Sequence, residues 1–168
     1  MPSAFLARLR DAPPLRAILG AGLVAGALDI TAAFGFYALR GVSPVRILQS
    51  VASGVMGSAA FSGGASTAAL GAALHFFIAT SAAAVFYLAS RRLPLLVQRP
   101  LVSGAAYGVA VYLFMNHVVL PLSAVANRPF VLGTAIVMVG IHIVCVGLPI
   151  ALIVRRAVPG TSIGTRRR

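Results

Sequence analysis

Three ionisable residues lie inside long apolar stretches of the sequence and are the first candidates for chemistry. Asp29 lies in the first stretch, His75 in the second and His142 in the fourth. A carboxylate and two imidazoles can relay protons, bind an ion, ligate a metal or haem, or hydrogen-bond to one another. Because charge is costly in such surroundings, each side chain is expected to have a partner.

The spacing of these residues predicts that they lie in one layer. If each stretch is a membrane-spanning helix, the depth of a residue is its distance from the end of the helix on the non-cytoplasmic side. At 1.5 Å per residue, Asp29 lies about 15 Å from that end, His75 about 14 Å and His142 about 18 Å. Asp29 also shares a helical face with Gly22 and Gly26. Small residues mark the interior of helix bundles in lipid, so we expect these side chains to point inward and form a polar cluster.

Three interpretations of the predicted cluster are open. In the leading one, hydrogen bonds among Asp29, His75 and His142 hold the bundle in register, without turnover. In the second, Asp29 and the histidines relay protons or ions in a small transporter. In the third and weakest, the two histidines ligate haem or a metal, but no HxxxH or CxxC spacing supports this. We therefore assign no metal site and no cofactor.

The sequence offers little for enzymatic chemistry. It contains no Glu and therefore no HExxH motif, and its glycine-rich stretches contain no phosphate-binding motif. No catalytic residue is assigned and no enzymatic activity is predicted.

The composition predicts a membrane protein. The chain has 168 residues, of which 60% are hydrophobic and 10% charged, with a mean hydropathy of +0.98. Globular domains contain about 25% charged residues, so too few polar side chains remain to cover a water-facing surface. A single Cys also argues against a disulfide scaffold.

Four apolar stretches are long enough to cross a bilayer as helices, which takes about 20 residues. We predict an all-α polytopic membrane protein, a four-transmembrane-helix bundle with spans over about 17–39, 66–89, 101–120 and 130–154. The bundle is one domain over about residues 1–156, and about 157–168 form a basic disordered tail. Glycines four apart allow close helix packing, and we assign this role to Gly22, Gly26, Gly104 and Gly108.

The arginines predict the topology. All 14 basic residues are Arg; eleven flank one side of the spans and three the other. Arg-rich loops stay in the cytoplasm, so both termini are predicted to be cytoplasmic. The arginines lack interleaved aromatic residues, which favours contact with anionic lipid headgroups over nucleic acid. The aromatic residues expected at the membrane interfaces are Phe36, Tyr37, Phe86, Tyr87 and Phe130.

A short amphipathic helix is predicted on the outer side over about 44–60. Ser43 and Pro44 are typical of an N-cap and a first helical position. Valines and leucines recur at helical spacing, while Gln49 and the serines lie mostly on other faces. We prefer a helix lying flat in the interface; the alternative is a re-entrant cap with Gln49 lining an entrance. Asn116 and His117 are the other outer-side polar residues.

Several motifs resemble those of known small bacterial inner-membrane proteins. They are Gly26-Ala27-Leu28-Asp29, Ser43-Pro44 with Gln49 to Gly54, Gly63-Gly64 leading to His75, and Asn116 through Leu120-Pro121-Leu122-Ser123. The chain is similar to the uncharacterised YagU-like type from about Arg16 to Arg156. The resemblance implies a four-helix protein of the bacterial inner membrane and implies no activity. The expected function is therefore structural or accessory, and whether the chain forms a homo-oligomer through its Gly and Ala faces stays open.

Overall fold

The computed structural model describes residues 13–125 and 130–157, and these residues form helices and no strand. Four helices are long and apolar enough to cross a membrane, over Pro14–Ala38, Gly64–Arg92, Pro100–Val119 and Leu132–Ala157. The all-α fold and the four long apolar helices are confirmed, with bounds close to those predicted. The predicted disordered tail lies outside the described residues from residue 158 onward.

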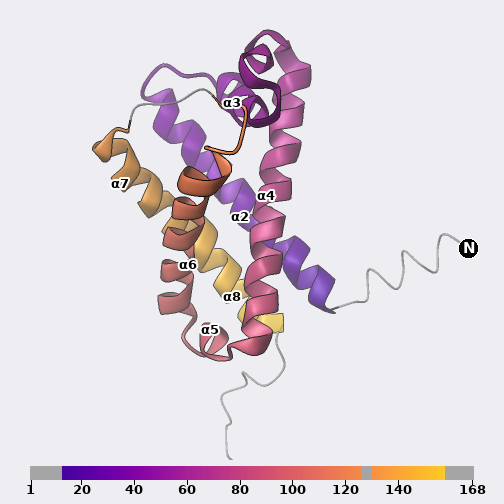
Figure 1. Cartoon of the computed structure of the whole chain (residues 1–168). Helices are drawn as coiled ribbons and strands as arrows, with labels where there is room; N and C mark the ends of the chain where they lie inside the picture. Colours follow the sequence, from indigo (N-terminus) through magenta and orange to yellow (C-terminus); the bar gives the residue numbers. More distant parts are fainter. Residues whose placement is uncertain (1–12, 126–129, 158–168) are drawn as a thin grey trace, which may run out of the picture.

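The helices run up and down between two ends of the molecule (Figure 1). α2 (Pro13–Ala38) leads to α3 (Pro44–Met56) and the 3-10 turn η1 (Gly57–Ser62) at one end. α4 (Gly64–Arg92) returns to the other end, where α5 (Leu95–Gln98) connects it to α6 (Pro100–Phe114). The last long helix consists of α7 (Leu132–Ile141), η3 (His142–Gly147) and α8 (Leu148–Ala157). The arginine-rich segments thus come to one end and α3 to the other.

The third and fourth long helices each contain a π-helical stretch. η2 (Met115–Val119) extends α6, and η3 joins α7 to α8. Each stretch is followed by a Leu-Pro pair, Leu120-Pro121 and Leu148-Pro149. Proline has no N–H and its ring crowds the carbonyl four residues earlier, so a regular turn is disfavoured there. The leucine N–H instead bonds the carbonyl five residues back in both places.

The predicted packing glycines lie where long helices cross. A Cβ atom built on Gly22 of α2 would lie 2.5 Å from Thr80 Cα, and one on Gly26 would meet the Phe76 ring of α4 at 2.8 Å. A Cβ atom built on Gly108 of α6 would lie 2.5 Å from the His142 carbonyl oxygen of η3, and one on Gly104 would lie 3.0 Å from the Gly147 carbonyl oxygen. Backbones approach this closely only where no side chain intervenes, which explains the small residues at these positions.

The buried core lies near the arginine-rich end. α2 contributes alanines, and α4, α5, η3 and α8 contribute larger side chains: Ala17, Ala21, Ala25, Ala83, Phe86, Tyr87, Val97, Val146, Ile150, Ala151 and Val154. Phe86 is 1% exposed and Tyr87 6%, so these two rings pack inside the bundle and do not face outward as interface residues would. The small alanines of α2 leave room inside the bundle for rings that would otherwise lie at the border.

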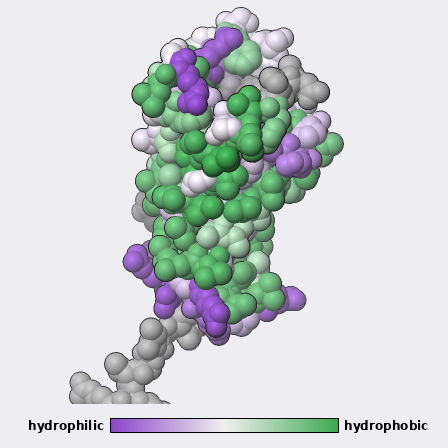
Figure 2. Space-filling view, turned by 90° about the vertical axis from the view of Figure 1, so that its left-hand side faces the viewer, coloured by the Kyte–Doolittle hydropathy of each residue, from purple (hydrophilic) through white to green (hydrophobic). Residues whose placement is uncertain are grey.

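The exposed surface between the two ends is mainly apolar. Figure 2 shows a broad hydrophobic band with hydrophilic residues above and below it. Phe77, midway along α4, and Val144, midway along the last long helix, are each more than half exposed. Water-soluble monomers rarely expose an apolar patch larger than a few hundred Å².

Candidate functional site

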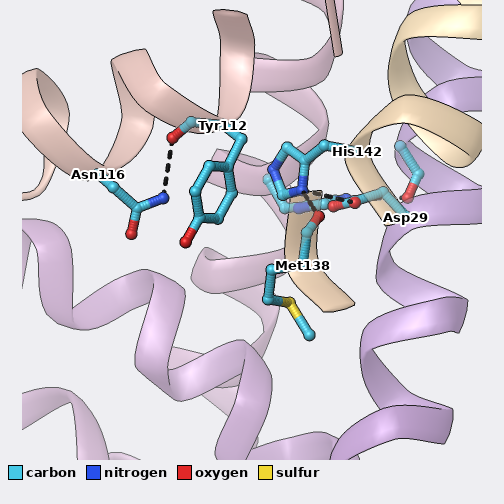
Figure 3. A network of polar contacts seen from close by, with 7 residues as sticks. Asp29, Tyr112, Asn116, Met138 and His142 are labelled. Atoms are coloured by element: carbon cyan, nitrogen blue, oxygen red, sulfur yellow. Dashed lines mark hydrogen bonds and ion pairs between the residues drawn. The ribbon is translucent and has the colours of Figure 1, made fainter. Parts of the chain in front are cut away.

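Asp29 of α2 and His142 of η3 come together in the structure (Figure 3). Asp29 Oδ1 lies 3.9 Å from His142 Nδ1, and the two side chains are 17% and 18% exposed. This separation exceeds that of a hydrogen bond, so the contact is an ion pair only when the imidazole is protonated. The Nδ1 atom of His142 is also 2.9 Å from the carbonyl oxygen of Met138, to which it donates.

Tyr112 of the third long helix lies on the other side of His142, and Asn116 lies beyond it (Figure 3). The Tyr112 ring meets the imidazole edge-on, with ring centroids 5.5 Å apart. Asn116 Nδ2 donates to the carbonyl oxygen of Tyr112 at 2.8 Å. The imidazole is therefore held between an acid on α2 and an aromatic ring on α6.

His75 does not complete the predicted cluster of three side chains. Its Nε2 atom lies 2.8 Å from the carbonyl oxygen of Gly26, one turn before Asp29 on α2. A carbonyl only accepts, so Nε2 carries the proton and donates. The three residues thus separate into the Asp29–His142 pair and a histidine that ties α4 to the backbone of α2.

Gln49 is buried, and it does not line an entrance. It is 5% exposed, and its Nε2 atom donates to the Gly64 carbonyl oxygen at 3.1 Å and to Thr67 Oγ1 at 3.4 Å. The buried residues of α3 are Ile47, Gln49, Ala52 and Ser53. The face of α3 that packs on α4 therefore consists largely of small and polar side chains. Gly71 of α4 has no side chain, so the Leu48 carbonyl of α3 approaches α4 closely there.

Asn116 and His117 are exposed and bonded within their own helix. Their side chains donate to the carbonyls of Tyr112 and Leu113 at 2.8 and 3.0 Å, each four residues back. His142 bonds Met138 in the same way, so a polar side chain supports the start of both π-helical stretches. Sequence reasoning missed these stretches, and the Leu-Pro pairs that follow them are the signal that identifies them.

Sequence reasoning also missed two further polar ties. The Tyr107 hydroxyl donates to the Ala82 carbonyl at 2.7 Å and so joins α6 to α4. Thr67 donates to the Ala60 carbonyl at 2.7 Å and joins α4 to η1. A tyrosine within an apolar helix is a signal in itself, because its buried hydroxyl needs a partner. Across residues 13–125 and 130–157, no buried side-chain nitrogen or oxygen is without a hydrogen-bond partner.

The described residues include no group of three His, Cys, Asp or Glu side chains that could hold a metal ion. Asp29 and His142 supply at most two ligands, fewer than the three or four of typical zinc sites. In comparisons with known proteins, no family model, curated protein or solved structure matches the chain. Its function is therefore argued from its own geometry.

Proposed function

We propose that the chain is a multi-pass protein of the bacterial inner membrane, with four transmembrane helices and both termini in the cytoplasm. Its proposed role is structural or accessory. Four helices of sufficient length and the apolar band between two hydrophilic ends support membrane insertion (Figure 2). The excess of arginines in the segments that join at one end supports the orientation, because such segments stay in the cytoplasm.

The pattern of interhelical hydrogen bonds carries the structural interpretation. His75, Tyr107 and Gln49 each donate to a backbone carbonyl of another helix or of a neighbouring helix start. A backbone carbonyl accepts a hydrogen bond but does not take up the proton, so none of these bonds joins two titratable groups. Interhelical hydrogen bonds of this kind stabilise helix packing in lipid by about 0.6 kcal/mol on average. The polar side chains therefore act as ties between helices.

The arginines at the cytoplasmic end supply the proposed contact with lipid headgroups. Arg91 and Arg92 end α4, and Arg155 and Arg156 lie in the last turn of α8. Each basic residue near an anionic surface contributes about 1 kcal/mol of attraction. This contact fixes the depth of the bundle and needs no single specific ligand.

A proton or ion relay is the second candidate, and the Asp29–His142 pair favours it. Both side chains keep some exposure, and their atoms are 3.9 Å apart without a hydrogen bond between them. His142 also begins a π-helical stretch, a feature that is frequent at functional sites. The pair thus places one titratable group on α2 and one on η3, where a proton could pass between the two helices.

Proton flux into liposomes separates the two candidates. The purified protein is reconstituted with a trapped pH-sensitive dye, and a potassium diffusion potential drives proton entry. We expect wild-type protein and Asp29→Asn to give the same rate as protein-free liposomes. A wild-type flux that Asp29→Asn abolishes, with the helical circular dichroism spectrum retained, would establish the relay and overturn the structural role.

A further inference from the structure

An apolar groove runs between α4 and α6 and is filled by no part of the described chain. Its deeper half is a cavity of about 450 Å³ between the two helices, and its outer half a cavity of about 480 Å³ beneath α3. Ile78, Met115 and Val119 line both halves, so the two cavities lie next to each other. α4 packs mainly on α2 and α3, and α6 on η3 and α8, which leaves the space between them open.

Small side chains on both walls create the groove, and one tyrosine closes its lower end. Ser81 and Ala82 of α4 face Ala110 of α6 across the deeper half. At the bottom the Tyr107 hydroxyl bonds the Ala82 carbonyl, and its ring lies edge-on against Phe86 at 5.0 Å. The remaining lining is apolar, so water gains no hydrogen bonds by entering.

The length of the groove matches one leaflet of a bilayer. Along α4 it reaches from Leu74 to Val85, about 16 Å at 1.5 Å per residue. The hydrocarbon core of a bilayer is about 30 Å thick, so one leaflet is about 15 Å. A helix is about 10–12 Å across with its side chains, and a single turn takes up about 400–600 Å³. Each cavity therefore has room for little more than one helical turn but takes a thin, extended hydrocarbon chain.

The outer mouth of the groove is polar, and Arg46 lies one helical turn from it on α3. Ser50 of α3 and Ser123 line it, and the segment after η2 is held to α3 by a hydrogen bond from Ala124 N–H to the Gly54 carbonyl at 2.9 Å. Arg46 lies one turn before Ser50, on the same face of α3, with its guanidinium stacked over Phe61 at 4.0 Å. A stacked guanidinium keeps its N–H edge available for a phosphate. Asp29, which lies beside His142, is the one acid among residues 13–125 and 130–157, so no carboxylate of these residues competes at this end.

We propose that this groove binds one acyl chain of a phospholipid, whose phosphate is bound by Arg46. The site rests on the proposed membrane location. The gradient from an apolar floor at Tyr107 to a polar mouth one turn from Arg46 matches a lipid, which is apolar along its tail and anionic at its phosphate. A second copy of the chain would present a helix, and each cavity has room for little more than one helical turn.

Native mass spectrometry of the full chain, released from phosphatidylglycerol-containing nanodiscs, tests the site. We expect wild-type protein to keep one phospholipid per chain. Ala110→Phe places a ring in the groove and should lower the lipid-bound fraction by roughly tenfold, because it displaces several buried methylenes. Ala106→Phe is the matched control, since Ala106 is exposed one turn away on α6 and does not line the groove. Arg46→Gln should weaken retention without filling the groove.

Each other outcome contradicts the site. A wild-type chain that keeps no phospholipid, or equal retention in Ala110→Phe and Ala106→Phe, would overturn it. A dimer that Ala110→Phe dissociates would show that a second copy occupies the groove. If Ala110→Phe does not fold, Ser81→Leu blocks the groove from the opposite wall. Alkaline extraction of membranes distinguishes failure of the lipid site from failure of the proposed function. A chain that is released at high pH contradicts membrane insertion. A chain that stays in the membrane but binds no phospholipid contradicts only the lipid site in the groove.

Discussion

Gly108→Ala tests whether close backbone packing between α6 and η3 holds the bundle together. A Cβ atom at Gly108 would lie 2.5 Å from the His142 carbonyl oxygen and 2.6 Å from Ile143 Cα. Ordinary van der Waals contact begins at about 3.4 Å, so the two helices must separate by about 1 Å. Both contacted atoms belong to backbone, and no side-chain rotation relieves the clash.

The expected cost follows from overpacking. Forcing extra atoms into a packed contact costs about 1–3 kcal/mol, and replacing Gly by Ala in a helix returns up to about 1 kcal/mol. We therefore expect Gly108→Ala to lower the free energy of unfolding by about 1–2 kcal/mol. Gly140→Ala is the matched control, because no atom lies within 4 Å of a Cβ built there. It should leave stability unchanged or raise it by up to about 1 kcal/mol.

Reversible unfolding in bicelles, followed by circular dichroism during titration with sodium dodecyl sulfate, measures both variants against wild type. The order of stability should be Gly140→Ala at or above wild type, with Gly108→Ala below. If Gly108→Ala is as stable as Gly140→Ala, the close approach of α6 and η3 is not a source of stability and the packing argument fails.

Three further substitutions test the polar ties in the same unfolding assay. His75→Phe keeps the ring but loses the donor to Gly26, and should cost about 0.6–1.7 kcal/mol; no loss would show that this bond is not a tie. Gln49→Leu removes the bond to the Gly64 carbonyl and should lower stability by about 1 kcal/mol, with faster proteolysis near α3 than in wild type. Asp29→Asn should cost less than His75→Phe, because Asp29 makes only a 3.9 Å contact with His142; a larger loss would mean a strong buried ion pair.

The sequence predicted the spans and the packing positions for physical reasons that need no tertiary information. A helix crossing about 30 Å of hydrocarbon must be long and apolar, so the spans are visible as continuous stretches. Gly22 and Gly108 stand out because glycines at a spacing of four leave a flat helix face. Depth along a helix is likewise a matter of counting, and so Asp29 and His142 could be expected to lie at similar levels.

The partners of the polar residues could not be predicted from counting. Depth gives no direction around a helix axis, and the π-helical stretch before Pro149 adds a residue to the turn that begins at His142. One extra residue rotates the following side chains by about 100°, so extrapolation at 3.6 residues per turn fails there. His75 meets a backbone carbonyl, which has no signature in the sequence.

The buried face of α3 was missed for a related reason. Hydrophobic periodicity identifies the apolar face of a helix but not the element it packs on. In α3 the close contact is made by Gln49, Ala52 and Ser53, because Gly71 of α4 admits backbone there, while Val45 and Val55 remain exposed. The valines form the apolar face that periodicity identifies, but this face is exposed. Periodicity alone would therefore place the wrong face of α3 against α4.

The orientation of truncated fusions tests the central claim, a four-span membrane protein with both termini in the cytoplasm. Alkaline phosphatase, which is active only outside the cytoplasm, is fused after residues 62, 98, 125 and 157. We expect high activity after residues 62 and 125 and background activity after residues 98 and 157. High phosphatase activity after residue 157, or the same activity at all four positions, would contradict it.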